Sequence, residues 1–243
     1  MGRAKDIVVK PIAAKDANAL VKSIHYSGKV APNSQLHLGV FMDGKCGGVM
    51  QFGPSYDKSK MLGLVEGTEW NGFIELNRMA FADWLPRNSE SRAIGYAFRW
   101  MRKQYPHIKW CVSFSDGTQC GDGTIYRASG FALTAIKKNS TIVTRQDGTK
   151  GSEFTGGRHL GGVPLPGFQL RYIYFLDPTA RQRLTVPILP FSEIDKRGAG
   201  MYRGKAKTSA GSSPVEHLAS SGEVGGSIPT PALNSSKSCV SEN

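Results

Sequence analysis

The sequence SFSDGTQCGDGTIYRASGF, from Ser113 to Phe131, decides how this chain is expected to fold. It opens as a buried strand, and from about Gly123 it is typical of a short helix that closes on a Gly-Phe pair. Between them, acidic and hydroxyl side chains gather among glycines. Open α/β sheets bind ligands at the carboxyl ends of their strands, so Asp116 becomes a candidate catalytic residue. An Asx-turn with Gly117 is the structural alternative for that carboxylate.

Working outward from this stretch, apolar periodicity predicts a mixed α/β chain. The expected strands are 6–12, 35–41, 46–52, 73–81, 109–116, 131–136 and 167–176, and the expected helices are 13–26, 91–104 and 123–129. This order of strands and helices predicts an α/β (α+β) fold, with a central mixed, mostly antiparallel sheet flanked by helices.

Composition divides the chain into two parts. Residues 1–203 are expected to form a single domain, in which 145–167, rich in Gly, Thr and basic side chains, form a mobile loop. Residues 204–243 are dominated by Gly, Ser and Pro and contain few large apolar side chains, which predicts a disordered tail.

The charge lies on the expected domain. The chain carries 31 Lys and Arg against 19 Asp and Glu, a net charge of +12, and the charges of the tail cancel. So basic a domain usually binds a polyanion, most often nucleic acid, with solubility as the plain alternative. The candidate phosphate contacts include Arg99, Arg102 and Lys103 on one helix, and Arg145 and Lys150 in the expected loop.

Several classes of protein are disfavoured. The four cysteines lie far apart without a CxxC spacing, which argues against a zinc site and a disulfide scaffold. No stretch approaches the roughly 18 apolar residues of a membrane span, and the N-terminus lacks the apolar run of a signal peptide. We therefore expect an intracellular protein with no membrane partner.

The start of the expected helix 91–104 is a candidate phosphate subsite. Helix N-termini attract anions through free N–H groups and the helix dipole. Ser89 and Ser91 lie there, flanked by Arg87 and Arg92. Helix capping alone is the alternative explanation for the two serines.

Four further side chains are candidates for the site. Arg78 lies in an expected central strand, where a charge is costly without a partner. Glu75 is three residues away, which under strict alternation puts it on the opposite face. His25 and Tyr26 follow a helix: they are either a C-cap or groups over the substrate, where the tyrosine stacks on a flipped base. Tyr126 is either a packing aromatic or an acid.

Four motifs carry a family resemblance: HYSGKVAPNSQLHLGV, ELNRMAF, PRNSESRAIG and the opening stretch. The element order resembles the GNAT acyltransferase superfamily, in which an aromatic-bearing helix ending in Gly-Phe follows a strand that splays from its neighbour. In this order, the four motifs resemble the Mom family of Mu-like bacteriophages, whose members are themselves GNAT-like. The resemblance covers about Lys5 to Ile194.

The resemblance implies a function. Mom proteins place a carbamoylmethyl group on N6 of adenine in phage DNA, which shields that DNA from host restriction. It therefore implies a transferase, double-stranded DNA as partner and the host cytoplasm as location. The residues that match the family's functional positions are His25, Tyr26, Arg78, Ser91, Asp116 and Tyr126.

The donor stays open. In ordinary GNAT enzymes the pyrophosphate loop has a glycine where this chain has Glu90, and a small residue where it has Arg92, which disfavours coenzyme A bound in the usual manner. The donor is either glycyl-tRNA or acetyl-CoA, so tRNA is a second possible partner. Iron has been proposed for the family, with His25, Tyr26, Asp116 and Tyr126 as candidate ligands by residue type only. The alternative to an enzyme is a non-catalytic DNA-binding protein with this fold. The sequence does not predict the oligomeric state.

Overall fold

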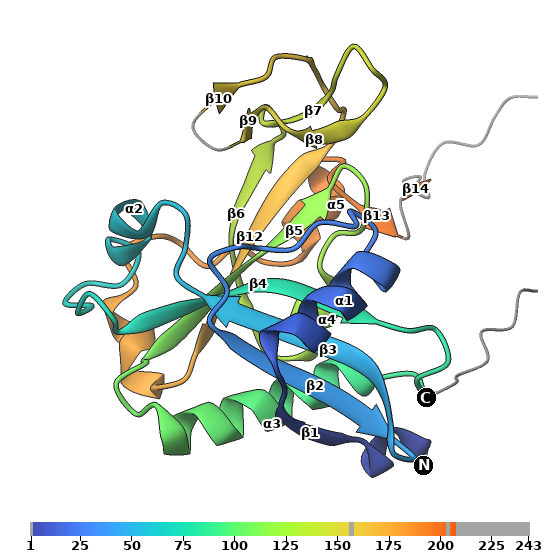
Figure 1. The fold of residues 1–243 in the computed structure, drawn as a ribbon. Helices are drawn as coiled ribbons and strands as arrows, with labels where there is room; N and C mark the ends of the chain where they lie inside the picture. The colour runs from blue at the N-terminus through green and yellow to red at the C-terminus, as the bar shows by residue number, and fades with distance from the viewer. Residues whose placement is uncertain (1, 156–157, 203–204, 208–243) are drawn as a thin grey trace, which may run out of the picture. The chain divides into compact units, whose positions relative to one another are not determined.

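A seven-stranded sheet organises the protein (Figure 1). The computed structural model describes residues 2–155, 158–202 and 205–207. The strand order is β1-β2-β3-β4-β5-β12-β6. The strands are β1 Val8–Pro11, β2 Leu36–Met42, β3 Lys45–Gly53, β4 Phe73–Phe81, β5 Trp110–Gly117, β12 Phe168–Phe175 and β6 Ala132–Lys138.

The parallel pair β4–β5 interrupts an otherwise antiparallel sheet. Its register covers only Phe73–Glu75 against Trp110–Val112, although both strands continue well beyond. We call the remaining segments, Leu76–Phe81 of β4 and Ser113–Gly117 of β5, the β4–β5 splay. Because buried backbone N–H and C=O groups need partners, the inner edges of the splay must bond to side chains, solvent or a ligand.

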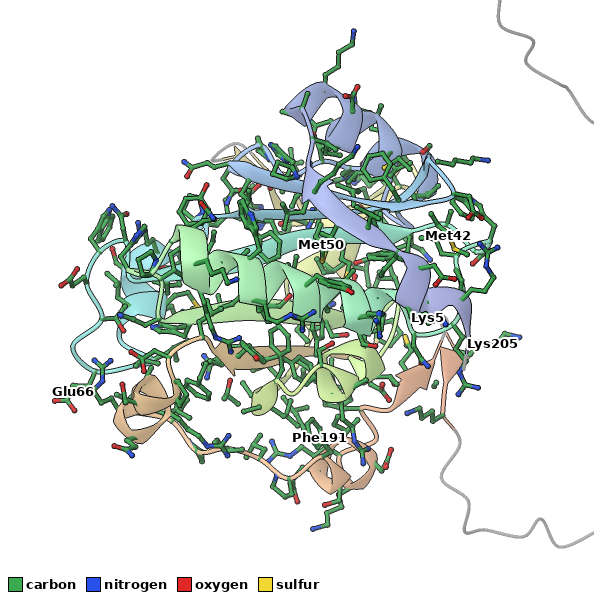
Figure 2. The ribbon with its side chains drawn as sticks, turned by 90° about the horizontal axis from the view of Figure 1, so that it is seen from below. Lys5, Met42, Met50, Glu66, Phe191 and Lys205 are labelled. Atoms are coloured by element: carbon green, nitrogen blue, oxygen red, sulfur yellow. The ribbon has the colours of Figure 1, made fainter. Side chains whose placement is uncertain are left out.

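Helices cover both faces of the sheet. α1 (Ala14–Ile24) packs Ala17 and Val21 against Val49 and Ala80 on one face. On the other face lie α3 (Ser89–Gln104) and α4 (Thr124–Ala128), and Figure 2 shows α3 running along that face. The ring of Phe98 in α3 contacts other aromatic rings within the largest apolar cluster. The amphipathic spacing of both helices explains why each covers one face.

The predicted mixed α/β fold is confirmed, including the splayed strand followed by an aromatic-bearing helix that ends in Gly-Phe. Every expected strand is present with its ends shifted by a few residues, and the expected helix at 91–104 begins at Ser89. The periodicity did not predict the short elements η1 (Arg3–Asp6), α2 (Lys58–Leu62), η2 (Pro178–Arg183) and α5 (Ser192–Lys196).

The segment expected to be a loop at 145–167 contains short strands. β7 (Ile142–Thr144) pairs with β8 (Lys150–Ser152) and with β11 (Val163–Pro164), and β9 (Phe154–Thr155) pairs with β10 (Arg158–His159). Asn139 holds the base of this insertion, because its side chain bonds the backbone at both ends of the excursion. In Figure 1 the insertion projects beyond the end of β6 and β12.

Pairing continues past the expected domain end at 203. β13 (Met201–Tyr202) pairs with β14 (Lys205–Ala206), and the Lys207 ammonium binds the buried Asp122 carboxylate. The remainder of the expected tail, 208–243, lies outside the described residues.

Candidate active site at the β4–β5 splay

Asp116 lies at the end of β5 and uses its two carboxylate oxygens differently. Oδ1 accepts the backbone N–H of Thr118 at 2.9 Å and the Thr118 hydroxyl at 2.5 Å. Oδ2 accepts the Tyr26 hydroxyl at 3.2 Å and, weakly, the Gln119 amide at 3.4 Å. One oxygen therefore makes the Asx-turn that spans Gly117, and the other faces the chain that follows α1. The structural and the functional interpretation of Asp116 are thus compatible.

The tight turn after α1 carries Tyr26 to Asp116. Gly28 makes this turn in the left-handed region, at φ 59°, where its N–H bonds the carbonyl of His25 at 2.8 Å. The side chain of Tyr26 is 50% exposed, and its ring lies 4.4 Å from that of His25. Although Tyr26 is half-exposed, its partial burial and then the charge of Asp116 raise its pKa. Tyr26 therefore stays protonated and donates to the carboxylate, while half of the residue remains exposed.

The hydrogen bonds of His25 fix its tautomer. Nδ1 accepts the backbone N–H of Ser27 at 3.2 Å and lies 2.8 Å from the Ser27 hydroxyl. Because the backbone N–H can only donate, Nδ1 is unprotonated and Nε2 carries the proton of the neutral ring. Burial, followed by the charge of Arg78, lowers the pKa of His25 to about 4. At neutral pH, His25 is thus an uncharged N–H donor.

Arg78 adjoins this group through the backbone. Its Nε donates to the carbonyl of Lys29 at 3.1 Å, and its Nη1 donates to the carbonyl of Asn77 at 2.8 Å. Its positive charge acts to lower the pKa of both His25 and Glu75. The guanidinium is therefore fixed beside the turn that carries His25 and Tyr26.

A β-bulge brings Glu75 to the face of Arg78. Arg78 and Leu76 pair with the adjacent residues Gln51 and Phe52, which leaves Asn77 as the extra residue. Glu75 and Arg78 then oppose Gly53 and Gln51, which share one face. The expectation from strict alternation, that they lie on opposite faces, is wrong for this reason. Burial raises the pKa of Glu75, whereas the Ser55 hydroxyl, at 2.5 Å, and the charge of Arg78 oppose that rise.

Tyr126 lies on α4 and bonds inside the protein. Its hydroxyl is 2.8 Å from that of Ser113, and the Ser113 hydroxyl is 3.1 Å from the carbonyl of Leu76. A carbonyl cannot donate, so Ser113 gives its proton to Leu76 and Tyr126 donates to Ser113. This chain bridges the two strands where their ladder ends. Burial raises the pKa of Tyr126 to about 12, and its ring packs against Phe131 and Tyr172.

Cys120 adjoins both tyrosines. A negative charge on Cys120 raises the pKa of Tyr26 and of Tyr126. Although Cys120 is exposed at the surface, partial desolvation by its neighbours and then the charge of Asp116 in turn raise the pKa of its thiol, so it stays protonated at neutral pH. A protonated thiol is a poor nucleophile, consistent with the absence of a sequence-adjacent histidine to activate it.

The start of α3 forms a separate group. Ser89 is fully buried and its hydroxyl donates to the carbonyl of Pro86 at 2.6 Å. The Ser91 hydroxyl lies 3.3 Å from the carbonyl of Asn88. The guanidinium of Arg92 lies over the Tyr96 ring. Arg87 is exposed. Within the described chain, no hydrogen bond links these residues to Asp116, Tyr26 or Tyr126.

These residues fit neither iron nor the pyrophosphate of coenzyme A well. The Nε2 of His25 presents a proton rather than a lone pair, and Tyr126 donates to Ser113. Among the described residues, no three His, Cys, Asp or Glu side chains are grouped as metal ligands. At the start of α3, the Ser89 hydroxyl is already bonded and Glu90 puts a negative charge in the first turn. We therefore derive no step through either group.

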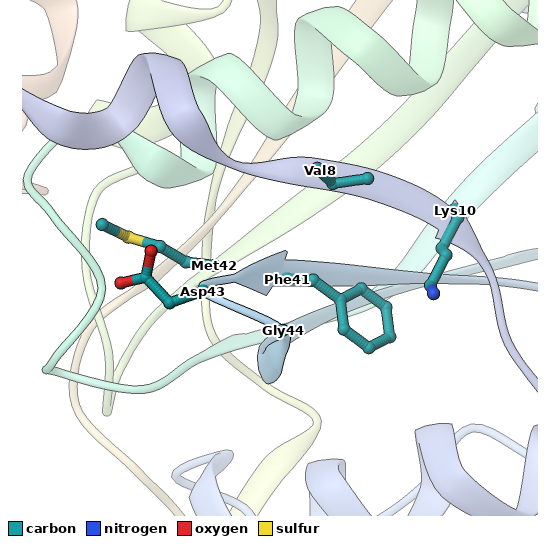
Figure 3. Close-up of a pocket in the computed structure, with 6 residues that line it drawn as sticks. All are labelled: Val8, Lys10, Phe41, Met42, Asp43 and Gly44. Carbon is teal, nitrogen blue, oxygen red and sulfur yellow. The ribbon is translucent and has the colours of Figure 1, made fainter.

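Two surface hollows lie away from these residues. One, of about 170 Å³, lies between β1 and the β2–β3 turn, and Figure 3 shows Lys10 and Phe41 beside it. The other, of about 340 Å³, is lined by Phe73, Tyr105 and His107 at the opposite end of β4 from the splay. Neither contains a candidate residue. In the described part of the chain, no helix is long and apolar enough to cross a membrane.

Comparison with known sequences identifies the family. The profile of the Mom protein family matches residues 6–193. The chain belongs to the Mom protein family. A curated relative, "Methylcarbamoylase mom" of Escherichia phage Mu, is 36% identical over 209 residues, which are 79% of this chain and 85% of the relative. The resemblance to the Mom family that the four motifs indicated is thereby confirmed.

Solved structures similar to this Mom family member are GNAT acetyltransferases. One, from Elizabethkingia anophelis with acetyl-CoA bound, is 13% identical, covers 70% of this chain and 98% of its own, and has a TM-score of 0.42. A putative phosphinothricin N-acetyltransferase is 11% identical over 70% of this chain and 99% of its own, with a TM-score of 0.44.

The structure thus brings together His25, Tyr26, Arg78 and Asp116, places Tyr126 on the other side of the splay, and leaves Ser91 with the start of α3. Ser113 was not identified from the sequence, where it resembles an ordinary buried strand residue. Glu75 was considered but was expected on the wrong face. The contact of Ser113 and the face of Glu75 follow only from how the strands pair.

Proposed function

We propose that this chain is a DNA-modifying transferase that converts adenine in double-stranded DNA to N6-carbamoylmethyladenine, and that it thereby protects phage DNA from restriction in the host cytoplasm. The observation that carries the proposal is the Asp116 carboxylate, one oxygen of which faces a half-exposed tyrosine at the splayed end of β5. Membership of the Mom family and the net charge of +12 support the same substrate.

The proposed roles follow from the contacts. A flipped adenine stacks on the open ring of Tyr26 and presents its amino group to Oδ2 of Asp116. Once the amine has attacked an acyl carbon it becomes acidic, so even a carboxylate already holding hydrogen bonds can take its proton. The N–H of His25 and the guanidinium of Arg78 stabilise the oxyanion. In the sequence-based hypothesis, Ser91 is the alternative oxyanion donor to Arg78.

The chemistry proceeds by acyl transfer and rearrangement. Adenine N6 attacks a glycyl ester, which gives N6-glycyladenine and the free alcohol. The glycyl amine then attacks ring carbon C6, and a five-membered spiro intermediate forms. Cleavage of the original C6–N6 bond leaves NH–CH2–CO–NH2 on C6, the carbamoylmethyl product. Protons move between nitrogens, and no oxidant or reductant is consumed.

Glycyl-tRNA is the proposed donor, because it carries an activated glycyl ester. The leaving group is then an alkoxide, a strong base, for which a tyrosine of pKa about 12 is a suitable acid. Tyr126 would protonate it, and the resulting tyrosinate would accept a hydrogen bond from Ser113 until solvent returns a proton. A thiolate leaves unprotonated near its ordinary pKa of about 8.5 and needs no such acid. Arg87, Ser91 and Arg92 are the proposed contacts for donor phosphates, with Ser89 shaping the helix start.

Two alternatives compete. One is iron-assisted transfer from acetyl-CoA, which requires metal: if fully metal-stripped protein still modifies DNA, it fails. The other is a DNA-binding protein without catalysis, which predicts ordinary DNA affinity and unmodified adenine.

The decisive experiment is nucleoside mass spectrometry of plasmid DNA from cells that express the chain. Modified adenine is expected with the wild-type chain and is expected to fall to a small fraction with Asp116→Asn. Unmodified DNA in both samples would contradict an enzymatic role. Separate 15N labels on adenine and glycine test the rearrangement: if the nitrogen on C6 comes from adenine, the rearrangement is wrong.

A further inference from the structure

Two cationic side chains meet beside the candidate site. The Lys29 ammonium and the Arg145 guanidinium lie 2.8 and 3.0 Å from the point where a Cβ on Gly151 would be. We call them the Lys29–Arg145 pair. Lys29 belongs to the turn after α1, and Arg145 follows β7, so the pair joins the turn to the insertion. Like charges this close repel each other unless an anion lies between or beside them.

The protein supplies little anionic compensation. Lys29 donates to the carbonyl of Lys150 at 3.4 Å, and Arg145 donates to the carbonyl of Ser152 at 2.9 Å and to the Thr149 hydroxyl at 3.3 Å. The Nε of Arg145 is buried without a hydrogen-bond partner. Within the described ranges, neither cation forms an ion pair with a carboxylate. The hydroxyl and the backbone N–H of Thr149 lower the pKa of Asp147, and the charge of Arg145 adds a smaller effect in the same direction.

The pair is connected to the site by short links. Tyr26, which bonds Asp116, lies three residues before Lys29. The carbonyl of Lys29 accepts the Nε of Arg78 at 3.1 Å. A base that stacks on Tyr26 would therefore have its own backbone phosphates beside the Lys29–Arg145 pair.

The rival basic surface on α3 is differently built. Arg99 lies over the Tyr96 ring, 4.6 Å from its centroid. Arg102 donates to the carbonyl of Leu176 and to the Tyr174 hydroxyl, both at 2.9 Å. Arg99 and Arg102 are thus held by neighbouring groups, as Arg145 is. The difference is that α3 covers the face of the sheet opposite α1, whereas Lys29 follows α1 on the side of Tyr26.

We propose that the Lys29–Arg145 pair is a phosphate-binding site that grips the DNA backbone next to the flipped adenine. The chemical class of the ligand is a phosphodiester of duplex DNA. This inference rests on the proposed function for the choice of DNA over other polyanions. It identifies the surface that holds the substrate. It also gives the insertion that contains β7 and β8 a role in DNA binding.

The test is the salt dependence of binding to a fluorescent DNA duplex. Each phosphate contact contributes about 0.9 to the slope of log affinity against log salt. The double variant Lys29→Gln/Arg145→Gln is expected to reduce that slope by about 2. Gly151→Val keeps the charge but fills the space between the cations, and it is expected to weaken binding in the same direction. The control is Lys109→Gln, which removes one charge immediately before β5.

Three outcomes would overturn the inference. The double variant could keep the wild-type slope, or Lys109→Gln could lower the slope as much as the double variant does. Arg99→Gln/Lys103→Gln could produce the whole loss instead, which would assign the DNA to α3. Finally, the double variant could weaken binding of tRNA but not of duplex DNA, which would assign the pair to the donor. Thermal unfolding of each variant verifies that a change in slope does not reflect loss of fold.

Failure of this inference is distinguishable from failure of the proposed function. Asp116→Asn is expected to keep the wild-type slope and lose modification. If wild-type protein yields no modified adenine, yet the double variant still loses slope, the phosphate site stands and the transferase does not. If modification is normal and the slope is unchanged in the double variant, only the phosphate site is wrong.

Discussion

On the Tyr26 side of the β4–β5 splay, one oxygen of Asp116 accepts a hydrogen bond from the half-exposed Tyr26, while the other makes the turn with Thr118. On the Tyr126 side, each polar group is bonded to the next, from Tyr126 through Ser113 to the carbonyl of Leu76. The first arrangement is open to a substrate, and the second ties the two strands together. Tyr126 can therefore act as an acid toward a substrate only by giving up its hydrogen bond to Ser113.

Asp116→Asn gives the largest expected effect. It removes the proton acceptor but keeps an oxygen for the Thr118 turn, so activity should fall by about 10²–10⁴-fold with little change in folding. The modified fraction of plasmid adenine measures the loss. Asp83→Asn, at an exposed carboxyl, is the matched control and should stay near wild type. Equal activity in both variants would remove Asp116 from the mechanism.

Tyr126→Phe tests whether the closed side takes part in chemistry. As a general acid toward an alkoxide, Tyr126 should contribute about 10²-fold. Ser113 keeps its bond to Leu76 in this variant, so the free energy of unfolding should fall by only about 1 kcal/mol. Single-turnover rates and urea denaturation measure the two effects. A loss of stability without a loss of rate would make Tyr126 a packing residue.

Tyr26→Phe tests the contribution of the Tyr26 hydroxyl on the open side. It deletes the hydrogen bond to Asp116 and keeps the ring, so a loss of about tenfold is expected, near the lower bound for a bond to a charged group. Tyr26→Ala should lose more, because stacking on the base is lost as well. If the two variants behave alike, the ring does not bind the base.

The role of His25 is also visible in the pH dependence of stability. Its pKa is about 4 in the folded protein and near its ordinary value of 6.5 when unfolded. Above pH 6.5 the ring is neutral in both states and contributes nothing. As pH falls from 6.5 to 4, the unfolded state binds the proton first, so stability is lost over that window. His25→Gln should lose less stability between pH 7 and 4.5, as measured by urea denaturation.

Local sequence patterns predicted the elements and the principal side chains of the open side. The apolar alternation of β5 and the glycines after it place Asp116 at the end of a strand whatever the rest of the chain does. The charge imbalance likewise indicates a polyanionic partner without any structure. These features depend on neighbouring residues, which the sequence displays directly.

The tertiary structure alone decided which side chains contact one another. The bulge at Asn77 brought Glu75 to the face of Arg78, because one extra residue in β4 reverses the alternation. Because β4 and β5 pair over only three residues, the Leu76 carbonyl is available to accept the Ser113 hydroxyl. The turn after α1 brings Lys29 close to Arg145. Each of these depends on strand register or on contacts between distant segments. The sequence by itself therefore determined which chemical groups are present and on which elements, whereas only the packing of those elements decided which groups meet.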